Sequence, residues 1–186
     1  MKTTRTSTLA AAFAVAAAAA LSMAGCKSAS STASPAPAAG PQARATIEPK
    51  SGSNVSGWAT FAERSTGGVR IEVHIENAPP GIHGLHLHDK GDCSAPDASS
   101  AGGHFNPGGR PHAGPNDAMR HAGDFGNITI ESNGTGHLEL VSDLLTVRPG
   151  PNSVVGRAVV FHEKEDDLKT QPTGNAGGRL GCGVVR

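Results

Sequence analysis

Alternating apolar and polar residues predict a series of short strands after the first third of the chain. Residues 69–76 alternate without a break, so their odd-numbered side chains are expected to face a core. Helical periodicity is nearly absent beyond the N-terminal region, and glycine- and proline-rich turns separate the strands. This pattern predicts an all-β, antiparallel sandwich or flattened barrel. Further strands are expected at residues 55–61, 124–131, 137–141, 153–162 and 181–185.

Two long segments do not follow the strand pattern. Residues 89–123 show no sustained periodicity, and residues 163–179 show little. Loops of this length inside a compact domain are usually functional or disordered. We therefore expect something other than apolar burial to order them.

The N-terminus has the pattern of an export signal. Lys2 and Arg5 precede an alanine-rich apolar run, which is typical of a secretory signal that is removed from the mature protein. The run ends at Met-Ala-Gly-Cys, residues 23–26, which resembles a bacterial lipobox except that leucine is usual at position 23. We expect residues 1–26 to be a lipoprotein-type signal peptide with Cys26 as the lipidation site. Ordinary cleavage that frees a soluble secreted protein is the alternative.

Composition divides the rest of the chain into a tether and one domain. Residues 27–45 are rich in Ala, Ser and Pro and predict a tether, whereas residues 46–186 are long enough for a single core. With Cys26 acylated, Cys93 and Cys182 remain as a pair, which in an exported domain indicates a disulfide. Closing such a loop is worth roughly 4 to 5 kcal/mol in the chain-entropy model.

The charge balance excludes a nucleic-acid footprint. The chain has 16 basic and 16 acidic residues, and loss of Lys2 and Arg5 leaves a mature net charge of about minus two. Any attraction for an anionic substrate must therefore come from local charge.

Histidines carry the chemistry that the sequence indicates. His86 and His88 are two apart in a predicted strand, so both rings project from one face. Such a pair alone is more often a solvated surface feature than a site, but the first long loop and its end supply three more imidazoles and a carboxylate. That set is suited to a closed tetrahedral zinc site. Its members are His104, His112, His121 and Asp124.

Five blocks in order resemble those of copper/zinc superoxide dismutases. The resemblance covers essentially residues 46–186 and implies an immunoglobulin-like, eight-stranded Greek-key β-barrel with two long functional loops. It implies dismutation of superoxide to dioxygen and hydrogen peroxide by alternate reduction and reoxidation of a histidine-bound copper ion. The blocks are Gly-Ile-His-Gly-Leu-His-Leu-His at 81–88, Gly-His-Phe-Asn-Pro at 103–107, His-Ala-Gly-Asp-Phe-Gly-Asn at 121–127, Val-Phe-His-Glu-Lys-Glu-Asp-Asp at 160–167 and Gly-Asn-Ala-Gly-Gly-Arg-Leu-Gly-Cys-Gly at 174–183.

The resemblance also implies two metal ions in each subunit. His104 would bridge copper, which cycles between Cu(I) and Cu(II), and a structural Zn(II), and would hold and return a proton. The implied copper ligands are His86, His88, His104 and His162, and the implied zinc ligands are His104, His112, His121 and Asp124.

Further roles follow from the same resemblance. Arg179 would dock the superoxide anion, and Cys93 and Cys182 would form the intrasubunit disulfide. Asp166 would accept hydrogen bonds from the outer nitrogens of His86 and His112 and so orient both rings.

The sequence also leaves open a function without catalysis. An envelope protein that binds and buffers copper and zinc without turnover would need the same ligands, but Arg179 would then have no purpose.

We expect a periplasmic, lipid-anchored protein, with the outer membrane favoured because Lys27 is not the aspartate that signals inner-membrane retention. A homodimer is left open, since Val155-Gly156 resembles an animal-type contact whereas Lys90 replaces an apolar contact residue.

Overall fold

The computed structural model describes residues 40–186 of the chain. The predicted signal peptide, the lipidation site at Cys26 and most of the predicted tether lie outside these residues. Within the described range, no helix has the length and hydropathy that crossing a bilayer requires.

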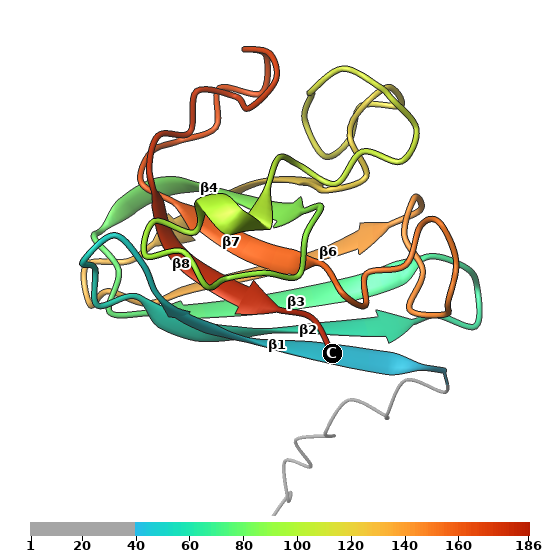
Figure 1. Cartoon of the computed structure of the whole chain (residues 1–186), viewed down its shortest axis with the longest axis horizontal. Coiled ribbons are helices and arrows are strands. Elements are labelled where there is room, and N and C mark those ends of the chain that lie inside the picture. Colours follow the sequence, from blue (N-terminus) through green and yellow to red (C-terminus); the bar gives the residue numbers. More distant parts are fainter. Residues whose placement is uncertain (1–39) are drawn as a thin grey trace, which may run out of the picture. The chain divides into compact units, whose positions relative to one another are not determined.

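Eight antiparallel strands close into one barrel, as the sequence predicted (Figure 1). Around the barrel their order is β1-β2-β3-β6-β5-β4-β7-β8, so the chain crosses over between β3 and β4 and between β6 and β7. These crossovers are the Greek-key connections. The strands are β1 (Gln42–Pro49), β2 (Ser56–Glu63), β3 (Val69–Glu76), β4 (Gly81–His88), β5 (Asp124–Ile130), β6 (Gly136–Ser142), β7 (Ala158–His162) and β8 (Arg179–Val184), with a 3-10 turn η1 (Ser99–Ala101) in the first long loop.

The barrel interior is built from the inward positions of these strands. β3 has the predicted alternation, because Val69, Ile71, Val73 and Ile75 are all fully buried while the residues between them are not. Side chains of β2 and β5 complete the core, with Phe61 and Phe125 in contact across it. The strands β4 and β7 of this barrel carry three histidines that the sequence predicts as metal ligands, His86, His88 and His162.

The first strand, β1, was not among those that the sequence predicted. Residues 42–45 were assigned to the tether, but they are part of β1 and pair with residues 59–62 of β2. Ala43 and Ala45 face the core beside Ile47. Two alanines bury little apolar surface, so their alternation was too weak to separate from the alanine-rich segment before it.

Strand limits near the C-terminus also differ from the prediction. β7 starts at Ala158 rather than at residue 153, because Gly156 has a positive φ of 80° in a turn that precedes the strand. Ser153 makes only an isolated bridge to Thr146. β8 starts at Arg179, two residues before the predicted start.

The first long loop is attached to β4 by backbone pairing. Phe105 N donates to Leu87 O and Leu87 N donates to Gly123 O, so two loop segments lie against one strand residue. A Cβ on Gly123 would lie 2.1 Å from Leu87 O, so only glycine permits this approach. The pairing also forms a bridge between His88 and His104 and thereby brings loop and strand histidines together.

Candidate metal centre

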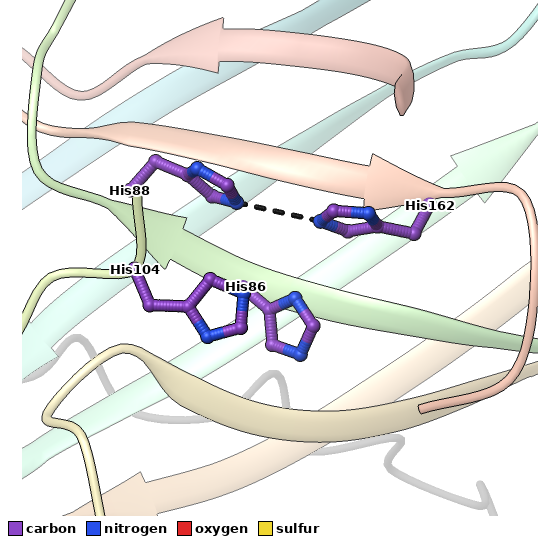
Figure 2. A group of neighbouring side chains, drawn as sticks. All are labelled: His86, His88, His104 and His162. Atoms are coloured by element: carbon purple, nitrogen blue, oxygen red, sulfur yellow. Dashed lines mark hydrogen bonds between the residues drawn. The ribbon is translucent and has the colours of Figure 1, made fainter. Parts of the chain in front are cut away.

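Four histidines from β4, β7 and the first long loop lie close together. His86 and His88 come from β4, His162 ends β7, and His104 is held beside His88 by the loop bridge (Figure 2). One ring nitrogen from each lies within 4.8 Å of the others, and no residue of the set is more than 8% exposed. The structure thus brings together the whole predicted copper set in a geometry that could hold one ion.

The ring nitrogens of this group lack the partners that buried polar atoms normally have. Among residues 40–186, His86 Nδ1 and His104 Nε2 are buried without a hydrogen-bond partner, and His88 Nε2 faces His162 Nε2 at 3.3 Å. An unsatisfied buried polar atom costs roughly 1 to 3 kcal/mol. The lone pairs of these nitrogens fit a metal ion, and imidazole is a ligand suited to copper and zinc.

A second group adjoins the first through His104. His104 Nδ1, His112 Nδ1 and His121 Nδ1 lie 2.9, 3.0 and 3.1 Å from Asp124 Oδ1, and the His104 and His121 nitrogens are 3.4 Å apart. A tetrahedral zinc site with bonds of about 2.0–2.1 Å has ligand-to-ligand distances of roughly 3.3 Å. The donor set and its spacing therefore fit zinc, and His104 offers one nitrogen to each group.

Electrostatics favour an ionised carboxylate in the second group. Burial opposes ionisation of Asp124, but hydrogen bonds with His104 and His112 outweigh it and hold the pKa of the carboxyl below its usual range. Backbone N–H groups of Ala113 and His121 donate to Oδ2 and leave Oδ1 to the three imidazoles.

The carboxylate of Asp166 links the two groups through hydrogen bonds to one histidine of each. His112 Nε2 donates to Oδ1 at 2.9 Å and His86 Nε2 donates to Oδ2 at 2.8 Å, and the Asp166 side chain is fully buried. These bonds hold a proton on Nε2 of each ring and turn His86 Nδ1 toward the first group and His112 Nδ1 toward Asp124 in the second. A Cβ on Gly174 would lie 1.8 Å from Asp166 Oδ1, so the second long loop needs glycine there.

Burial and hydrogen bonding shift the pKa values of His86 and His112 in opposite directions. Burial lowers the pKa of His86 to about 4, although the hydrogen bond with Asp166 opposes this. Burial also acts to lower the pKa of His112, but hydrogen bonds with Asp124 and Asp166 raise it to about 9.

Arg179 lies at the edge of the four-histidine group. It is paired with His162 in the β7–β8 register, and its Nη1 and Nη2 donate to Ala98 O and Gly102 O, both at 2.7 Å. Gly102 O also accepts from His88 Nδ1 at 2.9 Å, so one carbonyl holds both the guanidinium and a histidine of this group. A guanidinium has five N–H donors, so three remain for an anion.

The predicted disulfide links Cys93 in the first long loop to Cys182 on β8. Cys182 is buried with Ala98 and Ala101 in a small apolar cluster around η1. Because the carbonyls that hold Arg179 flank this turn, the disulfide and the cluster fix the guanidinium as well as the loop.

Two supporting residues were not identified from the sequence. Gln171 accepts from His112 N and donates to His112 O, both at 2.7 Å, and Asn127 exchanges two hydrogen bonds with the Asp166 backbone. Asn127 lay inside a recognised block, whereas nothing distinguished Gln171 from other polar loop residues. Both ring nitrogens of His83 contact backbone oxygens, those of His162 and Pro79.

Comparison with known proteins agrees with this geometry. Residues 55–185 match the family described as copper/zinc superoxide dismutase (SODC). A solved structure titled "Crystal Structure Analysis of the clock protein EA4" is 41% identical, with a TM-score of 0.70 over 77% of this chain and 92% of that chain. The chain belongs to the copper/zinc superoxide dismutase family.

Proposed function

We propose that the chain is an active superoxide dismutase that converts superoxide to dioxygen and hydrogen peroxide. Bound copper would supply the one-electron redox change, and zinc, which has no redox chemistry, would order the first long loop. The proposed copper ligands are His86, His88, His104 and His162, and the proposed zinc ligands are His104, His112, His121 and Asp124.

One observation, the position of Arg179, favours a catalytic function over metal storage. Arg179 presents unused N–H donors beside His88, on the carbonyl that also orients that ring. A cation there binds a small anion next to the four-histidine group. A protein that only buffers metal has no use for an anion site, and the cation would oppose copper binding.

His104 would handle the proton that the reaction needs. Its Nδ1 is held by the Asp124 group, while its Nε2 is buried and has no partner among the described residues. We assign to Nε2 the holding and return of one proton during the cycle. Asp166 would keep His86 in the orientation that the site requires.

The test is superoxide dismutation by residues 27–186 loaded with copper and zinc, beside Arg179→Ile and Arg179→Lys variants of measured metal content. A hydrogen bond to a charged group contributes about 1.5 kcal/mol at the low end, so Arg179→Ile should lower kcat/KM about tenfold. Arg179→Lys should retain part of the activity. Full copper occupancy with equal rates in all three proteins would refute anion docking by Arg179.

We further propose export to the periplasm and attachment through a lipid on Cys26. Support comes from the sequence alone, namely the signal pattern and the Met-Ala-Gly-Cys stretch at residues 23–26. Wild-type protein should partition into detergent and carry labelled fatty acid, whereas Cys26→Ser should not. Equal partition of both proteins into the aqueous phase would refute the anchor.

A further inference from the structure

The two histidines outside the metal centre and the barrel interior lie together on the outer face of the barrel. His74 on β3 and His137 on β6 are register partners, and Trp58 on β2 is the partner of His74 on its other side. Directly opposed side chains in an antiparallel pair have Cβ atoms about 4.5–5.5 Å apart. The two imidazoles thus come from directly opposed residues on the outer face, and β5 separates β6 from β4.

Carboxylates flank this pair along β3. His74 Nε2 contacts Glu76 Oε1 at 3.1 Å, and His137 Nε2 lies 3.9 Å from Glu72 Oε1. Glu72 and Glu76 are two residues on either side of His74 and so lie on the same face as its ring. The set combines imidazole and carboxylate, the ligand types of first-row divalent ions.

The surrounding charges distinguish the two carboxylates. Arg70 forms a two-pronged ion pair with Glu139 at 2.7 and 2.9 Å and also approaches Glu72 at 3.9 Å. Glu76 contacts no basic group other than His74 among the described residues. Glu76 is therefore the carboxylate most available to a cation.

The side chains of His74, His137 and Glu76 are exposed enough to change rotamer and bind an ion. The side chains of His74, His137 and Glu76 are 30%, 52% and 54% exposed. In the structure their ligand atoms are not gathered at one point, so binding requires a change of rotamer, which exposed side chains make readily. Water would complete the coordination, so binding would be reversible and weaker than in a buried site.

We propose that His74, His137 and Glu76 form a second metal site, on the barrel surface, for an imidazole-preferring divalent ion such as Cu²⁺, Ni²⁺ or Zn²⁺. This site is separate from the buried centre in position and in ligands. It does not depend on the proposed catalytic activity, because none of its residues contacts the buried groups.

Trp58 provides a direct readout. It is the single tryptophan of the chain, and its ring stacks on His74 with centroids 5.8 Å apart. A paramagnetic ion bound to His74 would lie close to the indole and quench its fluorescence. The experiment is titration of Ni²⁺ into protein whose buried sites already hold copper and zinc, with nickel counted after dialysis.

We expect saturable quenching with one additional nickel per chain. His137→Gln leaves the Trp58 contact intact and should weaken binding about tenfold or more, since loss of even an outer-shell partner of a metal ligand costs roughly 10- to 100-fold. Glu76→Gln should weaken binding less. Glu139→Gln removes the same charge from the same face and should change the affinity less than about twofold, because this exposed charge is screened.

Two outcomes would overturn the site. One is unchanged quenching in His137→Gln, which would mean that the histidines do not chelate together. The other is an equal loss in Glu139→Gln and His137→Gln, which would reduce the effect to diffuse surface charge.

Discussion

Asp166→Asn tests how the two metal groups depend on one shared carboxylate. The wild-type side chain accepts hydrogen bonds from His86, His112 and Leu168 N. An amide keeps the shape but has one acceptor oxygen and no charge, so at least one imidazole N–H loses its acceptor. Loss of such a partner costs about 10- to 100-fold in metal affinity, or roughly 1.4 to 2.7 kcal/mol.

The loss should be larger at the zinc group. His86 is fixed by the pairing of β4 with its neighbours, whereas His112 lies in a loop, where hydrogen bonds with Gln171 and Asp124 also position it. The assay is competition with a chromophoric chelator for zinc and for copper separately. Asp167→Asn is the matched control, since its exposed side chain caps Thr170 and touches neither ring. A greater loss of copper than of zinc, or an equal loss in the control, would refute this reasoning.

Three further predictions concern the fold around the site. Gly174→Val should prevent metal loading, because a Cβ would clash with Asp166 Oδ1, and metal analysis of the purified variant checks this. Replacing Cys93 and Cys182 by alanine should lower the free energy of unfolding in urea by up to about 4 to 5 kcal/mol, given a sequence separation of 89, and unchanged stability would contradict it. The metal-free protein should be most stable near pH 6.5. Below that pH the unfolded chain binds more protons, because the pKa of His86 is lowered to about 4, so stability falls between pH 6.5 and 4. Above it, stability falls as the pH rises toward 9, because the pKa of His112 is raised to about 9 and its protonated form stabilises the fold. Urea midpoints that rise steadily from pH 4 to 9 would contradict the assignment for His112, and midpoints that fall steadily would contradict the assignment for His86.

Strong alternation made the central strands predictable, while weak alternation hid others. β3 was predicted in full because four large β-branched or apolar residues alternate with polar ones. β1 was missed because its inward positions include Ala43 and Ala45, which carry little hydrophobic signal. β7 was overextended because nothing in the apolar pattern marked the turn at Gly156.

Candidate ligands could be found from the sequence because their residue types are rare and their blocks were recognisable. The supporting contacts could not. Gly102 orients both His88 and Arg179 through a backbone carbonyl, which has no side-chain signature. Gln171 acts through a contact 59 residues distant in sequence, and only the fold brings it to His112. The pairing of His74 with His137 likewise depends on strand register, which the sequence does not show.

The most direct test of the central claim is the rate of superoxide decay with residues 27–186, measured by stopped flow for the metal-free protein and for protein with measured copper and zinc content. We predict fast turnover in proportion to bound copper and none in the metal-free protein. Full occupancy of both sites without turnover would contradict the enzyme assignment and favour a metal-buffering protein with the same fold.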